Sequence, residues 1–341
     1  MSKKKTLLNT LFLVLVFGIT IYGVFHGQNL NELASYIQNA DTRYWIVSAI
    51  CVVMFICGES VIIYYMMRTI GQNHISMWHC VLYSFVGFFF SCVTPGATGG
   101  QPMQLYYMNK DKVPLSVGTL VLMIVTITYK LVLVVIGGAV FLFRPAGVMK
   151  YLQPVLGWCY LGFALNIFAV VSMFILVFHP TLAANIVNLL IKILDKIHLL
   201  RHKEKIQKKA DAAMTQYRDV AVYFQTHKTV VWNVFLLTCL QRGFMFYVTY
   251  LTYRSFGFAG IGMPVIVTLS GMISVAVDML PLPGGMGITE KLFMAMFKPI
   301  FENMTLAVMV VSRGLSYYTE LLISAIFTIV AHLCIGRGVK K

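Results

Sequence analysis

The residues best suited to chemistry lie in one stretch of the C-terminal half, where two carboxylates flank a cluster of helix breakers. Asp278 precedes this cluster and Glu290 follows it, and between them stand Pro281, Pro283, Gly284, Gly285 and Gly287. Interrupted backbone is tolerated at membrane depth only where it is buried in protein or lines a wet cavity. Ionisable groups inside an apolar segment are by default candidates for a transport pathway. The stretch therefore predicts a broken, re-entrant helix beside a polar pathway.

A related stretch occurs earlier, between Ser91 and Pro102, and makes a chance origin of the pattern less credible. Its candidate loop residues are Thr94, Pro95, Gly96, Gly99, Gly100 and Gln101. Helix N-termini carry a partial positive charge, so residues 96–101 and 284–288 would offer two such ends to an anionic group. The alternative is that both Pro-Gly breaks merely end helices at a crowded packing site.

Further charged residues fall within or close to apolar runs. They are Glu59, Lys130, Arg242, Asp278, Glu290, Lys291, Arg313 and Glu320. Any one of them alone is explained by a structural ion pair or by a side chain that reaches the membrane interface. Together they predict a polar cavity, in which guanidinium groups suit phosphate and carboxylates suit an ammonium group or protons. The candidate substrate-binding set is Glu59, Lys130, Arg242, Asp278, Glu290, Arg313 and Glu320.

The last span adds a geometric expectation to this set. Arg313 and Glu320 are seven residues apart and share one face of a helix about two turns apart. Glu290, just past the second break, is placed to reach one of them.

The elements that position these residues are membrane helices. The chain has 341 residues, of which 59% are hydrophobic and 11% charged, and its mean hydropathy is +0.79. These values exclude a soluble domain and indicate an all-α polytopic membrane protein. The net charge of +15 sits mainly in loops, where the positive-inside bias and anionic headgroups explain it without nucleic acid.

Hydropathy divides the chain into about six full transmembrane helices and two re-entrant hairpins. The first run is expected to be a retained span rather than a cleaved signal peptide. The lysines before it place the N-terminus in the cytoplasm, and the basic tail with Arg337, Lys340 and Lys341 places the C-terminus there too. The expected spans are 7–25, 44–67, 114–143, 152–178, 230–253 and 305–334, and the expected hairpins are 78–107 and 264–301. The seven cysteines have no paired spacing and are expected to be small buried side chains.

Residues 179–229 form the long hydrophilic stretch and are expected to be a cytoplasmic basic linker. Its first part, residues 183–200, has apolar residues at helical spacing beside Lys192 and Lys196. Two interpretations stay open, an amphipathic helix on the inner leaflet and a solvated helical linker. His198 and His202 have the spacing of a metal pair, but no third ligand accompanies them, so no metal site is expected.

Two halves of the chain correspond within a single domain of residues 1–341. The motif Arg68-Thr-Ile-Gly recurs as Arg254-Ser-Phe-Gly, 186 residues later, and Pro95-Gly recurs as Pro283-Gly, 188 residues later. The charge bias gives the two units opposite orientations. The sequence therefore predicts a first repeat at 43–143 and a second, inverted repeat at 229–335, an arrangement that recurs in transporters.

At these residues the sequence resembles the lysylphosphatidylglycerol synthase transmembrane-region family, also called flippase-like, which includes the membrane half of the bacterial multiple peptide resistance factor. The resemblance covers nearly the whole chain. Its most specific parts are residues 94–100, residues 281–287 with Glu290, and Arg313. Where the family pattern has Glu-Arg, this chain has Tyr129-Lys130, which keeps a positive charge without the bidentate geometry of arginine.

The resemblance implies a lipid flippase of the cell membrane. In relatives this region is implicated in moving aminoacylated phosphatidylglycerol to the outer leaflet, which lowers the negative surface charge and protects against cationic antimicrobial peptides. The implied substrate is an anionic or aminoacylated phospholipid of the lysyl-phosphatidylglycerol type. Two further partners stay open, a separate soluble aminoacyl-transferase and a second copy of the chain.

Two other functions compete with transport of a lipid. One is a phosphatidylglycerol lysyltransferase-type enzyme or its membrane subunit, but residues 179–229 are too short for the soluble domain that uses aminoacyl-tRNA in the full-length synthase. The other is a proton-coupled carrier of a small solute. The sequence has no phosphate loop, metal-site spacing or nucleophile elbow, so neither a cofactor nor a catalytic residue is expected.

Overall fold

The structure is a computed structural model that describes residues 30–179, 181–182, 184–185, 189 and 203–336, and within these residues it contains helices and no strand. The longer helices are α2 (Leu30–Gln38), α3 (Arg43–Thr69), α4 (Met77–Val93), α5 (Gly100–Lys110), α6 (Leu115–Phe143), α7 (Ala146–Leu152), α8 (Leu156–Phe178), α10 (Lys203–Thr226), α11 (Lys228–Ser255), α12 (Met263–Val277), α13 (Ile288–Phe301), α14 (Thr305–Arg313) and α15 (Thr319–Ala331). The short turns are η1 (Pro95–Ala97), η2 (Gln153–Val155), η3 (Pro283–Gly285), η4 (Glu302–Met304), η5 (Gly314–Tyr318) and η6 (His332–Gly336).

Helix length and hydropathy confirm an all-α polytopic membrane protein. Five segments of the described chain are long and apolar enough to cross a membrane, namely Arg43–Thr69, Leu115–Phe143, Ala146–Val177, Lys228–Ser255 and Pro283–Ile335. Two shorter apolar helices, Met77–Val93 and Met263–Val277, accompany them. The first expected span, 7–25, lies outside the described residues, so the total of six spans stays a prediction.

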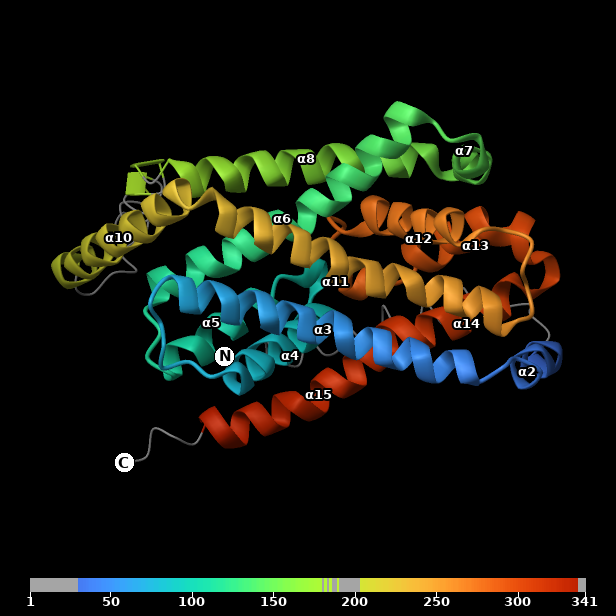
Figure 1. The fold of residues 1–341 in the computed structure, drawn as a ribbon, viewed down its shortest axis with the longest axis horizontal. Coiled ribbons are helices and arrows are strands. Elements are labelled where there is room, and N and C mark those ends of the chain that lie inside the picture. Colours follow the sequence, from blue (N-terminus) through green and yellow to red (C-terminus); the bar gives the residue numbers. More distant parts are fainter. Residues whose placement is uncertain (1–29, 180, 183, 186–188, 190–202, 337–341) are drawn as a thin grey trace.

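Both Pro-Gly stretches interrupt helices, as the sequence predicts. After α4, Pro95 begins the turn η1 and Gly96 has a φ of +59°; after α12, Pro283 begins η3 and Gly284 has a φ of +55°. A positive φ favours glycine because other residues are strained there by their Cβ atoms. In each case the chain reverses and the two short helices pack together as a hairpin, α4 with α5 and α12 with α13 (Figure 1).

The first hairpin closes tightly because small residues line its contact. A Cβ atom on Gly100 of α5 would lie 2.7 Å from the carbonyl oxygen of Gly87 in α4. A Cβ on Gly87 would lie 2.4 Å from the amide group of Gln104. Glycine at both positions therefore lets α4 and α5 approach closely.

The two hairpins lie toward opposite ends of the molecule, and their tips meet between them. In Figure 1, α3 and α11 run side by side, with α4 and α5 near one end and α12 and α13 near the other. The turns η1 and η3 contact each other. An ideal Cβ on Gly96 would lie 3.7 Å from the Cα of Pro281, so the two backbones touch at the tips.

The order of span, hairpin and span occurs twice along the chain. The matched motifs also share backbone geometry, since Gly71 and Gly257 have φ values of +83° and +81° after α3 and α11. The terminal turns of these two helices have the same capping pattern, with a backbone N–H bonded to the carbonyl oxygen of Arg68 in one and of Arg254 in the other. This likeness supports the expected repeats at 43–143 and 229–335, although their duplication and inversion stay predictions.

Part of the expected cytoplasmic linker is a helix packed on the bundle. The helix α10 contacts α6, α8 and α11, and its residues Tyr217, Ala221 and Phe224 are buried. Residues 183–200, proposed as an amphipathic helix, lie largely outside the described residues, as do Lys192, Lys196, His198 and His202.

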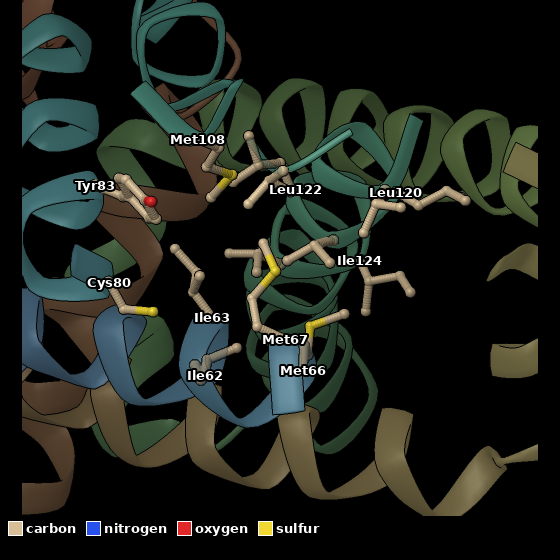
Figure 2. Packing of buried hydrophobic residues seen from close by; sticks show 14 of the residues in the cluster. Ile62, Ile63, Met66, Met67, Cys80, Tyr83, Met108, Leu120, Leu122 and Ile124 are labelled. Carbon is tan, nitrogen blue, oxygen red and sulfur yellow. The ribbon is translucent and has the colours of Figure 1, made fainter. Parts of the chain in front are cut away.

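Apolar packing fixes the base of the first hairpin to the helices around it. Figure 2 shows Ile62, Ile63, Met66 and Met67 of α3 packed with residues of α4, α5 and α6. A second cluster holds the second hairpin against α6, α11 and α14. Each hairpin is thus anchored at its base, and its tip projects toward the middle of the molecule.

Candidate functional site

A cavity of about 570 Å³ lies where the hairpin tips meet. It collects most of the charged residues that the sequence singles out. The substrate-binding candidates in its wall are Glu59, Lys130, Arg242, Asp278, Arg313 and Glu320, and the loop candidates are Gly96, Gln101, Gly284 and Gly285. The candidates outside its wall are Glu290, Thr94, Pro95, Gly99, Gly100, Pro283 and Gly287. Lys291 is exposed.

Lys130 is paired across the cavity wall. Its Nζ atom lies 2.6 Å from Oδ2 of Asp278 and 3.0 Å from the sulfur of Met279. Lys130 belongs to α6, whereas Asp278 caps the C-terminal end of α12. The pair therefore ties the second hairpin to α6 immediately before the break.

Arg313 and Glu290 hold the tip of the second hairpin from the other side. Arg313 Nε donates to Glu290 Oε1 at 2.8 Å, and Arg313 Nη2 donates to the carbonyl oxygen of Gly284 at 2.9 Å. This contact confirms that Glu290 reaches the last span. Glu290 Oε2 also accepts a hydrogen bond of 2.6 Å from the backbone N–H of Gly287. The positive end of α13, expected to face an anionic ligand, is thus capped by a carboxylate of its own first turn.

Tyr317 joins the two tips. Its hydroxyl donates to the carbonyl oxygen of Cys92 in α4 at 3.0 Å. Its ring lies against Gly284, where a Cβ atom would come within 2.1 Å of it, and the guanidinium of Arg313 lies 4.7 Å from the ring centroid. Tyr317 lies in η5, a π-helical turn between Arg313 and Glu320 that changes the helical register expected from their spacing.

Arg242 has a different environment from Lys130 and Arg313. It is 4% exposed, and its Nε and Nη2 atoms have no hydrogen-bond partner among the described residues. Its guanidinium lies between two rings, 3.9 Å from the centroid of Tyr129 and 4.9 Å from that of Phe246. Buried guanidinium groups are costly without an acceptor. The arrangement leaves Arg242 ready to bind an anion in the cavity.

Glu59 and Glu320 are the two carboxylates of the cavity wall that lack a cation partner among the described residues. Glu59 is 8% exposed and accepts a hydrogen bond of 2.6 Å from Gln104 Nε2. Glu320 is 9% exposed and accepts from the thiol of Cys92 at 3.5 Å. Among the described residues, the wall thus has one guanidinium and two carboxylates that belong to neither ion pair.

Uncharged polar groups complete the wall, and most were missed in the sequence. Gln104, Thr126, Thr249, Ser270 and Ser274 all line the cavity. Gln101 donates to Thr126, and the hydroxyls of Thr249 and Ser270 lie 2.9 Å apart. The available signal was the spacing of Gln101 and Gln104, three residues apart in α5, and of Ser270 and Ser274, four apart in α12. Either spacing places two polar groups on one helix face.

The fold and the cavity define a polytopic membrane protein in which two broken-helix hairpins enclose a charged site. The family model described as "Lysylphosphatidylglycerol synthase TM region" matches residues 7–324, and the chain belongs to that family. Membership confirms the expected family and supports a lipid-related function in the membrane. A comparison with curated proteins returns no match.

Proposed function

We propose that this protein moves an anionic or aminoacylated phospholipid, of the lysyl-phosphatidylglycerol type, between membrane leaflets by binding its headgroup in the cavity. The observation that carries the proposal is Arg242. A buried guanidinium with unpartnered N–H groups, facing a cavity of about 570 Å³, is suited to a phosphate. Cavities of roughly 300–1,000 Å³ hold small ligands, so a headgroup fits while its acyl chains stay in the bilayer.

The two carboxylates that are not in ion pairs would select for a positively charged group on the lipid. Glu59 and Glu320 line the same cavity without a cation partner among the described residues, so they suit the ammonium groups of an aminoacylated headgroup. Lys130 and Arg313 already bind Asp278 and Glu290, and we assign these four residues to positioning the second hairpin rather than to the phosphate.

The direction and location follow from the family resemblance and the charge bias. We place the chain in the cell membrane with both termini in the cytoplasm. Delivery of an aminoacylated lipid to the outer leaflet makes that surface less negative. Cells that contain the protein would therefore resist cationic antimicrobial peptides better than cells without it.

The test is a leaflet-resolved assay of Arg242→Gln in reconstituted vesicles. Vesicles contain lysyl-phosphatidylglycerol in the inner leaflet, and a membrane-impermeant amine-reactive reagent detects its appearance outside. Loss of a charge-assisted contact worth about 1.5–3 kcal/mol lowers the transfer rate by roughly tenfold to a hundredfold. Arg242→Lys is expected to recover only part of the rate, because lysine lacks the planar fork of arginine.

Arg218→Gln is the matched control, since Arg218 is exposed on α10 and should leave the rate unchanged. Wild-type transfer in Arg242→Gln contradicts the proposed site. New lipid species in the vesicle extract would indicate a lipid-modifying enzyme instead, and uptake of free lysine or phosphate without lipid movement would indicate a solute carrier.

A further inference from the structure

The cavity has an imbalance of charge that the binding of phosphate does not explain. Its two ion pairs, Lys130 with Asp278 and Arg313 with Glu290, are each neutral. Among the described residues of the wall, this leaves Arg242, Glu59 and Glu320 without an ion pair. If all three were charged, the empty cavity would carry one net negative charge.

The three residues form a single electrostatic group. Glu59 of α3, Arg242 of α11 and Glu320 of α15 line the same cavity, and α3 contacts both α11 and α15. The other charged or titratable residues of the described wall are Cys92 of α4, Tyr129 and Lys130 of α6, Asp278 at the end of α12, Arg313 of α14 and Tyr317 of η5. Gln104 of α5, which contacts Glu59, is uncharged. No further cation among these neighbours is free to balance the second carboxylate.

A membrane interior resists uncompensated charge, because moving a single ion out of water costs several kcal/mol. The empty cavity becomes neutral when one proton is shared by Glu59 and Glu320 while Arg242 balances the other carboxylate. Binding then changes the net charge of the cavity by the net charge of the headgroup. A headgroup with a charge of +1 restores neutrality only if that proton leaves.

We propose that the protein exchanges protons for charged headgroups, so that the number of protons displaced equals the net charge of the lipid bound. This rests on the proposed function. For a headgroup of charge +1, the carboxylic acid becomes a carboxylate beside an ammonium group, and its proton passes to water on the side from which the lipid entered. A zwitterionic headgroup displaces no proton, and a headgroup of charge −1 takes one up on the second carboxylate.

The experiment counts protons when purified protein in lipid nanodiscs binds three short-chain lipids. The probes are lysyl-phosphatidylglycerol, phosphatidylcholine and phosphatidylglycerol, with net charges of +1, 0 and −1 at neutral pH. Calorimetry in two buffers of different ionisation enthalpy gives the proton count for each. We expect about one proton released, none exchanged and about one taken up, respectively. Inorganic phosphate is a separate probe, and binding of phosphate alone would show an anion site that does not require a lipid.

Glu320→Gln and Glu59→Gln distinguish exchange from nonspecific protonation. Each removes one of the two carboxylates, so the remaining one balances Arg242 and no shared proton is left. Release on binding of lysyl-phosphatidylglycerol should fall from about one proton to near zero, while phosphatidylcholine still binds. Glu302→Gln is the control, because Glu302 is exposed and outside the cavity wall, and it should retain release of about one proton.

The outcomes separate the two proposals. An equal proton count for all three lipids, or an unchanged count in both cavity variants, overturns proton exchange while lipid binding stands. If none of the three lipids binds, the proposed function fails and proton exchange fails with it. In vesicles, an acidic lumen should accelerate wild-type transfer of lysyl-phosphatidylglycerol into the inner leaflet several-fold relative to a neutral lumen. The slower transfer expected of Glu320→Gln should be the same with an acidic and with a neutral lumen.

Discussion

At the scale of single residues, the charged side chains of the cavity divide into two kinds. Lys130 and Arg313 are bonded to carboxylates and hold the second hairpin, whereas Arg242 has unpartnered N–H groups. The residue types alone do not separate these roles, since a lysine or an arginine in an apolar run can form a structural ion pair or bind a ligand. Their neighbours on other helices decide which role each has.

A double-mutant cycle on Arg313 and Glu290 measures the positioning role. Arg313→Leu leaves the carboxylate of Glu290 without its cation and releases the carbonyl oxygen of Gly284. We expect a loss of about 3–5 kcal/mol in the free energy of unfolding, measured in detergent, because a buried charge loses its partner. Glu290→Leu with Arg313→Leu should lose less than the sum of the single variants. Strictly additive losses would show that the two side chains do not act together.

At the scale of elements, the hairpins depend on glycine both for turning and for close packing. The breaks were predictable from Pro95, Gly96, Pro283 and Gly284, because these residue types interrupt helices wherever they cluster. The contact of Gly100 with Gly87 was not, since it depends on which faces of α4 and α5 meet. The register shift at η5 was equally hidden, because residues 314–318 carry no residue type specific to a π-helical turn.

In the site, too, residue types were predictable from the sequence and contacts between segments were not. Of the seven substrate-binding candidates chosen as charges in apolar runs, six line the cavity, and the seventh, Glu290, lies outside its wall. The sequence did not reveal that Glu290 caps α13 or that Arg242 lies between Tyr129 and Phe246. Both facts depend on contacts between side chains of different segments. Hydropathy and charge patterns contain no information about such contacts.

Gly100→Ala tests the tight hairpin. The added Cβ would lie 2.1 Å from Ser91 Oγ and 2.7 Å from the Gly87 carbonyl oxygen, so α4 and α5 must separate. Overpacking of this kind costs roughly 1–3 kcal/mol, and a lower melting temperature in detergent should report it. Gly243→Ala in α11 is the control, because nothing lies within 4 Å of its added Cβ. There the substitution should be neutral or stabilise by up to about 1 kcal/mol. Equal destabilisation by both variants would contradict the close approach of α4 and α5.

At the scale of the whole molecule, α3 and α11 form a shared support for both halves. Gln241 of α11 donates to the carbonyl oxygen of Phe55 in α3 at 3.0 Å, and its side chain fits against Gly58. The next residues along the two helices are Glu59 and Arg242, so this contact fixes the positions of this carboxylate and this guanidinium relative to each other. We expect these two helices to stay together while the hairpin tips move.

A disulfide between positions 58 and 241 tests this rigidity. A Cβ on Gly58 would lie 3.1 Å from the Cβ of Gln241, near the separation of about 3.5–4.5 Å found in disulfides. In a chain with its seven native cysteines replaced, Gly58→Cys with Gln241→Cys should form the bond. Lipid transfer should continue at a similar rate in oxidised and reduced protein, with each single variant as a control. Transfer that stops on oxidation and returns on reduction would show that α3 and α11 must separate.

The contact between η1 and η3 has a consequence for the electrical properties of the molecule. The two turns touch beside the cavity, so we expect a headgroup that changes leaflets to pass them and any net charge that it carries to experience the membrane voltage. One elementary charge that crosses 100 mV alone gains or loses about 2.3 kcal/mol. A cationic headgroup that crosses in one direction while a proton crosses in the other performs no net electrical work. Transfer should therefore proceed at the same rate in strongly and weakly polarised membranes.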